Sequence, residues 1–444
     1  MKSRHFHIQF TITLVLLLLI LIQGLTHVFS MKPLNGFTEE LKEESLSFET
    51  YYNGTYQNFL TKYAKENTGF REFFIRNYNQ VLYSCFNKIT NNTIVKGSNG
   101  ELFLTMYLNE ITGKQLIRDF GEVESAKADA RKNVEATQAL IDTLHNHGTE
   151  FLFVFCPTKT AVYPEHMPRY FQNHIAEFSL EEYYIELFKE YGIPHIDFLN
   201  YFKTIKDTVA YPLYARTGTH WAQWTMPFVA DSILRKLESI TGYELPHIQI
   251  LDENLTTDYT SQDAELMANM NLLLPFSTPS LPRPEFTLTD TIGKDRPNLL
   301  VVADSYFYTL RQTSFTKAFN HWDYWVYNRE VQSSRQCYDG KLLKWVFDAL
   351  DVIEEADVVM ALFTAPMLYD YMFGFPSYAQ ELFDHGPVSD EEAIQNIIQR
   401  IYSLPEWYQA IEQQAIDRDI TLEENLRNNA EYLLYTHKQA KLNN

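Results

Sequence analysis

The sequence predicts an α/β protein in which a mostly parallel β-sheet is covered by helices on both faces, a three-layer sandwich. Apolar runs at residues 151–156, 298–303 and 357–363 are typical of strands buried on both faces. Segments with helical patterning lie between these runs, and such alternation favours parallel strands. We also expect a membrane helix at the N-terminus and a helical tail at the C-terminus.

Composition limits the possible classes of protein. The 444 residues can form one large domain or two to three small ones. A net charge of −20 disfavours nucleic acid as a partner. Three cysteines, without a CxxC pair, build neither a disulfide framework nor a zinc site. The 15% aromatic content is common in sugar-handling proteins, or it reflects a lineage bias in composition.

The N-terminal segment is a candidate membrane anchor. Lys2 and Arg4 precede an apolar run, and residues 6–29 are long enough to cross about 30 Å of hydrocarbon. The flanking charge places the N-terminus in the cytoplasm. We therefore expect residues 1–30 to anchor the protein in the inner membrane by a single pass, with the body in the periplasm or otherwise outside the cytosol. The alternatives are a cleaved signal peptide, although Ala-x-Ala is absent, and a buried core helix.

The rest of the chain divides into three parts. Residues 31–95 form a stalk and a leading helix, residues 96–388 the α/β domain, and residues 389–444 a helical tail. Within the domain, residues 245–295 are rich in Pro and Thr and weak in periodicity, which predicts an irregular insertion. Further predicted elements are a hairpin at 93–104, helices at 122–147, 181–190, 222–241 and 341–350, strands at 194–198 and 324–327, and tail helices at 391–402, 406–415 and 422–437.

Ser305 is the first candidate for chemistry. It follows Asp304 just after the predicted strand at 298–303, where α/β folds place their sites. If a helix begins there, its N-terminal amides can stabilise an oxyanion. The alternative is that Asp304 and Ser305 only cap that helix.

His220 is the second candidate. It lies between Thr219 and Trp221 in a predicted loop before a helix, a setting that suits a general base. Alternatively, its ring is satisfied by the backbone at a helix start. A serine hydroxyl needs a base to become a nucleophile, so the two candidates support each other.

The blocks Thr217-Gly218-Thr219-His220-Trp221 and Ala303-Asp304-Ser305-Tyr306-Phe307 resemble the SGNH-hydrolase-like domain of the alginate O-acetyltransferase family, of the AlgX and AlgJ type. The likeness extends in order over residues 48–370. It includes Gly69-Phe70-Arg71 with Asn79, the glycine turn at 97–103, and Pro157-Thr158-Lys159 followed by Tyr163-Pro164-Glu165.

Two positions depart from the family pattern. Ala303 replaces a glycine, which keeps the position small. Gly218 stands where the family carries the acid that orients the histidine. His220 is then held by a carbonyl, by a carboxylate from elsewhere, or by nothing.

The resemblance implies O-acetyl transfer to a cell-surface or exported polysaccharide through a Ser305 acyl-enzyme with His220 as base. It also implies a membrane-bound O-acyltransferase as acetyl donor. Transfer to water would make the same site an esterase. The alternative, which Gly218 supports, is a non-catalytic carbohydrate-binding or scaffold subunit. No phosphate loop, dinucleotide fingerprint or metal-ligand spacing occurs, so we expect no cofactor and no metal.

Six further residues are candidates for contacts with the substrate or the oxyanion. Asp304 more simply shapes the turn beside Ser305. Arg216 steers an anionic sugar or pairs with a carboxylate. Lys159 and Tyr163, with Glu165, line the cleft or form a rigid turn. The remaining two are Trp221, beside the histidine, and Asn328, which follows the third strand and could donate to an oxyanion.

Overall fold

A six-stranded sheet forms the centre of the molecule. The computed structural model describes residues 2–36, 43–259, 261–289, 295–335, 339–340 and 348–442. The strand order is β4-β3-β10-β7-β8-β9. Five strands run parallel, and only the edge strand β9 is antiparallel to its neighbour. The strands are β3 (Glu150–Cys156), β4 (His195–Asp197), β7 (Leu299–Ala303), β8 (Trp322–Val326), β9 (Glu330–Ser333) and β10 (Val358–Thr364). The predicted parallel α/β fold is confirmed.

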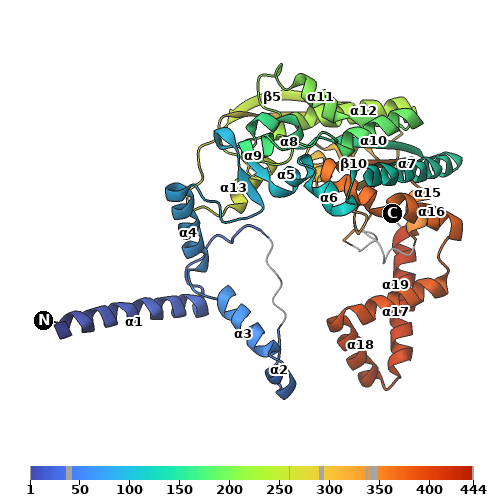
Figure 1. The fold of residues 1–444 in the computed structure, drawn as a ribbon. Coiled ribbons are helices and arrows are strands. Elements are labelled where there is room, and N and C mark those ends of the chain that lie inside the picture. Colours follow the sequence, from blue (N-terminus) through green and yellow to red (C-terminus); the bar gives the residue numbers. More distant parts are fainter. Residues whose placement is uncertain are drawn as a thin grey trace.

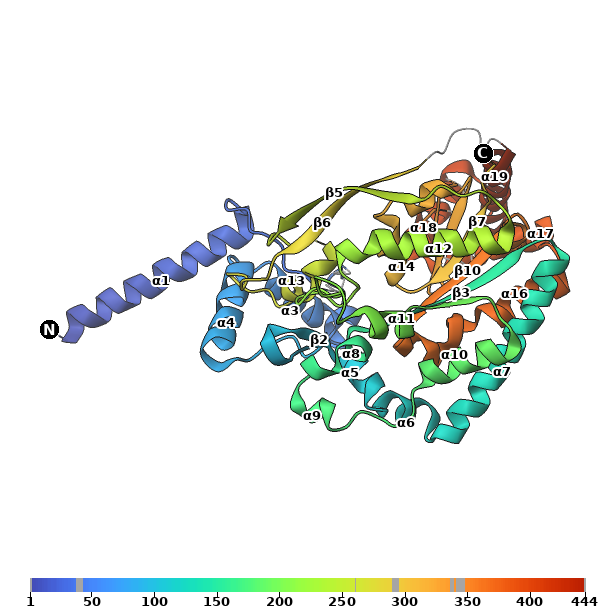
Figure 2. The ribbon, with the colours of Figure 1, turned by 90° about the horizontal axis from the view of Figure 1, so that it is seen from above.

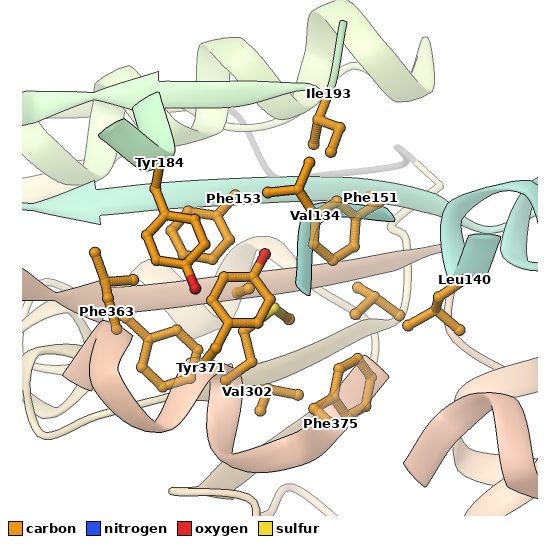
Figure 3. Packing of buried hydrophobic residues seen from close by; sticks show 14 of the residues in the cluster. Val134, Leu140, Phe151, Phe153, Tyr184, Ile193, Val302, Phe363, Tyr371 and Phe375 are labelled. Carbon is orange, nitrogen blue, oxygen red and sulfur yellow. The ribbon is translucent and has the colours of Figure 1, made fainter. Parts of the chain in front are cut away.

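Helices cover both faces of this sheet, as Figures 1 and 2 show. On β3, Phe151, Phe153 and Phe155 point to one core, and Leu152 and Val154 point to the other. Figure 3 shows the first core, where Phe153 and Phe363 pack near Tyr184 and Tyr371. Strands buried on both faces must be apolar throughout, which is why the runs were visible in the sequence.

Different helices complete the two cores. The first core is closed by α7 (Val123–Asn146), α10 (Leu180–Tyr191), α15 (Ala349–Glu354) and α16 (Phe375–His385). The second is closed by α11 (Phe198–Ile205), α12 (Met226–Thr241) and α14 (Tyr306–Arg311). Most of the predicted helix at 341–350 lies outside the described residues.

The N-terminal part stands apart from the sheet. Helix α1 (Lys2–Thr26) contains a 22-residue segment, His5–Thr26, whose mean hydropathy reaches 2.4 over an 18-residue stretch, and it is long and apolar enough to cross a membrane. After it come α2 (Phe48–Tyr52), α3 (Thr55–Glu66) and α4 (Arg71–Phe86). The predicted hairpin forms from β1 (Ile94–Lys96) and β2 (Leu102–Leu104), which pair antiparallel. It is followed by α5 (Thr105–Ile111) and α6 (Lys114–Phe120).

The segment at 245–295 is not irregular throughout, contrary to our prediction. It contains a long antiparallel ribbon of β5 (Ile248–Thr256) and β6 (Leu281–Leu288), and the short helix α13 (Glu265–Asn269) lies between them. Most β5 side chains are exposed, and prolines occupy two positions of β6. A ribbon that buries so little leaves only a weak hydrophobic period in the sequence.

The C-terminal tail is helical, as predicted. It consists of α17 (Asp390–Ser403), α18 (Pro405–Arg418) and α19 (Leu422–Leu442), with a small apolar cluster of its own. Figure 1 shows these helices below the sheet domain.

Candidate active site

Ser305 lies at the carboxyl edge of the sheet, directly after β7. The carboxylate of Asp304 accepts hydrogen bonds from the amide of Tyr306 at 3.0 Å and from the amide and hydroxyl of Thr364 at 2.8 and 2.7 Å. Burial, the largest influence, raises the pKa of Asp304 in spite of these bonds. Asp304 therefore ties the turn to the end of β10 and shapes the position of Ser305.

His220 reaches the same place from a loop 85 residues earlier in the chain. Its Nε2 lies 3.0 Å from the Oγ of Ser305. The neighbouring Trp221 is fully buried, and its indole N–H donates to the hydroxyl of Thr309 on α14. Trp221 thus fixes the histidine loop to the helix that follows Ser305 and presents no surface to a substrate.

A carboxylate from elsewhere in the chain, one of our three alternatives for His220, completes the constellation, although the sequence did not identify it as Glu265. Both oxygens of Glu265, the first residue of α13, lie near Nδ1 of His220, at 2.8 and 2.9 Å. One of these oxygens also accepts the backbone N–H groups of Thr219 at 2.8 Å and His220 at 3.1 Å. The structure therefore brings a carboxylate from a distant segment to the histidine nitrogen that faces away from Ser305.

Gly218 explains how that segment can come so close. A Cβ atom at Gly218 would lie 2.3 Å from the carbonyl oxygen of Gln262 and 3.2 Å from the Cα of Asp263. Real side chains do not tolerate the first distance, so the backbone before α13 occupies the space that a side chain at position 218 would need. Gly218, which stands where the family carries an acid, therefore also leaves the space for the segment that brings Glu265 to His220.

Two acids in this segment have opposite pKa shifts. For Glu265, burial is the largest influence and opposes ionisation, but the hydrogen bonds and charge of His220 and the amide of Thr219 outweigh it, so its pKa is lowered. For Asp263, burial dominates and raises the pKa to about 7, although the amide of Gln223 donates to this carboxyl. Glu265 is therefore the ionised carboxylate beside the imidazole at neutral pH.

Residues 112–298 match the family described as "SGNH hydrolase-like domain, acetyltransferase AlgX". This part of the chain is thus similar to an AlgX-type SGNH hydrolase-like domain. The matched range includes His220 and Glu265 and ends before Ser305. No curated protein matches the chain.

Among solved structures, the O-acetyltransferase domain of Pseudomonas putida AlgJ is 16% identical with a TM-score of 0.39, over 66% of this chain and 99% of that one. Pseudomonas aeruginosa AlgX is 17% identical with a TM-score of 0.39, over 61% of each chain. Bacillus cereus PatB1, with a sulfonyl adduct, is 11% identical with a TM-score of 0.40, over 65% of this chain and 99% of that one.

Lys159 does not line the cleft of the AlgX-type domain, contrary to one of our two expectations. It is 1% exposed, and its ammonium lies 2.8 Å from a carboxylate oxygen of Glu101. Burial lowers the pKa of Lys159 in spite of Glu101. Its three N–H groups are shared among Glu101 and the main-chain carbonyls of Leu102, Ala215, Arg216 and Gly218, which all lie within hydrogen-bond distance of the ammonium. Lys159 thus joins the hairpin to the loop that carries His220.

Tyr163 and Arg216 also have structural partners. The hydroxyl of Tyr163, a buried residue, accepts the amide of Leu213 at 3.0 Å. The guanidinium of Arg216 lies 4.0 Å from Glu101, which agrees with the carboxylate pairing that we considered for it. Glu165 lies nearer the surface and pairs with Lys206. The rigid-turn alternative describes this segment better than a cleft lining.

Two groups that we expected to face an oxyanion have other partners. The amide of Tyr306 is already engaged by Asp304, and the side-chain amide of Asn328 donates to the carbonyl of Phe373 at 3.0 Å. Tyr327 instead lies beside Ser305, and burial, the largest influence, raises the pKa of Tyr327. Tyr327 lies at the end of β8, next to β7 in the sheet, and that position was its only signal in the sequence.

Metal ligation has no support in the described ranges. No group of three or more His, Cys, Asp or Glu side chains there is placed to hold a metal ion. The chemistry available at this edge of the sheet is that of a hydroxyl, an imidazole and a carboxylate in series, with a phenol beside the hydroxyl.

Proposed function

We propose that this protein is an O-acetyltransferase that modifies a cell-surface or exported polysaccharide. The observation that carries the proposal is the hydrogen-bonded series Ser305–His220–Glu265, with a distance of 3.0 Å between serine and histidine and 2.8 Å between histidine and glutamate. The match to the AlgX acetyltransferase domain supports the same chemistry. The name of the AlgJ structure also describes an O-acetyltransferase domain.

In the first half-reaction, His220 takes the proton of Ser305 as the Oγ attacks the acetyl carbonyl of the donor. Glu265 accepts the Nδ1 proton and stabilises the imidazolium that forms. The hydroxyl of Tyr327, which lies beside Ser305, would donate to the oxyanion. The leaving group departs with the proton from His220, and an acetyl ester remains on Ser305.

In the second half-reaction, His220 deprotonates a sugar hydroxyl, which attacks the acetyl ester. The acetyl group moves to the sugar oxygen, and the proton returns to Ser305. Glu265 supplies the orientation that Gly218 cannot, and it therefore argues against a non-catalytic carbohydrate-binding or scaffold subunit. If water replaces the sugar, the product is acetate and the activity is that of an esterase.

The cellular setting is part of the same proposal. Residues 1–30 would anchor the protein in the inner membrane by one pass, with the body in the periplasm. The apolar α1 supports this placement. A membrane-bound O-acyltransferase would supply acetyl groups from the bilayer, and the tether would hold the site at a high effective concentration beside it.

The test uses the full chain in detergent with 4-nitrophenyl acetate as donor. We expect a burst of nitrophenol, an acetyl adduct on Ser305 in the mass spectrum, and neither of these with Ser305→Ala. Adding oligosaccharides distinguishes transfer from hydrolysis, because transfer places the acetyl group on the sugar. If the wild type and Ser305→Ala, both folded, are equally inert with every donor, the enzymatic proposal is wrong.

A further inference from the structure

Helix α4 carries an exposed apolar face. Phe74, Tyr78 and Val81 are 48%, 62% and 53% exposed, and Cys85 is an exposed free cysteine. Residues three and four positions apart share one side of a helix, so these four form a continuous stripe, which we call the α4 face. An apolar stripe on a solvent-exposed face is typical of a site that contacts a membrane or another protein.

The opposite side of α4 is fixed to the body of the protein. The side-chain amide of Asn79 donates to the carbonyls of Met270 and Asn271 at 3.1 and 3.2 Å. The ring of Tyr83 stacks on Phe276 at 5.7 Å. These contacts fix the helix, and they direct the α4 face away from the sheet domain.

The start of α4 is also fixed to the end of α1. A Cβ atom at Gly69 would lie 2.1 Å from the carbonyl of Ile20, and a Cβ at Gly24 would lie 2.4 Å from the carbonyl of Asn67. Such close backbone contact joins the two segments. Figures 1 and 2 show α4 running across the end of α1, with the body on the far side of α4. The α4 face is therefore turned toward the side on which α1 extends.

The charge of this region differs from that of the whole chain. The chain carries a net charge of −20, whereas residues 55–88 contain five basic and only two acidic side chains. The basic residues are Lys62, Lys65, Arg71, Arg76 and Lys88. Nine of these 34 residues are Tyr or Phe. Protein surfaces that lie at the boundary between lipid headgroups and acyl chains are typically rich in aromatic and basic side chains.

We propose that the α4 face lies in the interfacial layer of the bilayer that α1 spans, with anionic headgroups against the basic residues around it. The proposal rests on α1 being a membrane helix, but not on the acetyltransferase activity. A single spanning helix leaves the body free to tilt, and a second contact at α4 fixes its orientation. Because α4 holds residues 270–276, just after α13, the same contact fixes the segment that carries Glu265.

The experiment uses the full chain in vesicles of phosphatidylethanolamine and phosphatidylglycerol. A fluorophore is attached to Cys85 in a Cys337→Ser background, since Cys156 is fully buried. Two matched probes replace it in Cys85→Ser chains. Leu17→Cys reports on α1, and Ile416→Cys reports on α18, where that side chain is 68% exposed. Lipids carry a nitroxide either near the headgroup or deep in the acyl chain.

We expect the shallow nitroxide to quench the Cys85 probe several-fold more than the Ile416 probe, and the deep nitroxide to quench the Leu17 probe. Phe74→Ser with Tyr78→Ser should lower quenching at Cys85 and leave Leu17 unchanged. Phosphatidylcholine in place of phosphatidylglycerol should weaken the Cys85 signal.

Two results would overturn the proposal, and they have different meanings. If the Leu17 probe is quenched while Cys85 behaves like Ile416, the anchor stands and the α4 face is left for a protein partner. If neither Leu17 nor Cys85 is quenched, α1 does not span the bilayer and the anchor fails as well. Neither result bears on the Ser305 chemistry, which is measured separately with a soluble donor.

Discussion

Replacing Glu265 by glutamine tests the catalytic constellation most directly. The wild-type carboxylate accepts hydrogen bonds from Nδ1 of His220 and from the backbone amides of Thr219 and His220. A glutamine of the same size has only one oxygen. That oxygen can keep the two backbone bonds and still accept from Nδ1 at 2.8 Å, but the NH2 group then lies 2.9 Å from the same nitrogen and competes for it as a donor.

When the NH2 group donates to Nδ1, that nitrogen presents its lone pair and the remaining ring proton lies on Nε2, which faces Ser305 at 3.0 Å. His220 then donates to the serine and cannot accept its proton. Loss of the orienting acid in serine hydrolases with the wrong tautomer lowers kcat by about 10⁴. This is about 5 kcal/mol of transition-state stabilisation, since each tenfold is about 1.4 kcal/mol. The free energy of unfolding should fall by only about 1–2 kcal/mol, because most of the hydrogen bonds of residue 265 can be retained.

Burst kinetics with 4-nitrophenyl acetate measure the acylation step, and chemical denaturation measures the free energy of unfolding. Glu253→Gln is the matched control, because Glu253 lies on the exposed ribbon of the same segment. Acidification is not an equivalent perturbation, because the pKa of Glu265 is lowered and the carboxylate stays ionised near neutrality. An acylation rate for Glu265→Gln within tenfold of wild type, with the protein folded, would refute the role assigned to Glu265.

Three further predictions concern positions around this site and in the core. Gly218→Ala places a Cβ 2.3 Å from the carbonyl oxygen of Gln262, so it should lower the free energy of unfolding by about 1–3 kcal/mol and slow acylation of Ser305. An unchanged acylation rate would contradict the argument that Gly218 makes room for the segment of Glu265. Lys159→Met removes the ammonium that Glu101 and four main-chain carbonyls share, and should lower the free energy of unfolding by about 3–5 kcal/mol. Adding Glu101→Gln should recover part of that loss, and no recovery would count against the ion pair. Burial raises the pKa of Glu110, in α5, to about 8. The protonated Glu110 therefore contributes fully to the free energy of unfolding below about pH 4.5. This contribution declines toward pH 8, by up to about 1.4 kcal/mol per pH unit. Glu110→Gln should flatten that decline in unfolding measured against pH, and an equal slope in both proteins would place the titration elsewhere.

Residues near one another in the chain made much of the fold predictable. The apolar runs of β3, β7 and β10 identify strands buried on both faces, and the glycine turn at 97–100 identifies the hairpin of β1 and β2. The edge strand β9 and the ribbon of β5 and β6 were missed. Their residues are partly exposed, so the period of their side chains is not reinforced by a core.

The site was predictable only in part. Ser305 and His220 stand in short polar blocks beside apolar elements. That they act together was inferred from the need of a serine for a base and from the family resemblance. The roles expected for Lys159 and Asn328 depended on what surrounds each side chain. The ammonium of Lys159 is surrounded by four carbonyls and a carboxylate that come from distant parts of the chain. No pattern in the residues near Lys159 predicts these partners.

The sequence by itself determined the class of fold, the apolar N-terminal helix, and the serine and histidine, because each depends on side chains a few positions apart. Tertiary structure decided which group orients His220. The acid position in the histidine block holds Gly218, and the carboxylate arrives from Glu265, 45 residues further along the chain. Glu265 can approach because Gly218 has no Cβ and the backbone at Gln262 passes through the space that a Cβ would fill. This fit exists only when the two segments are folded against each other.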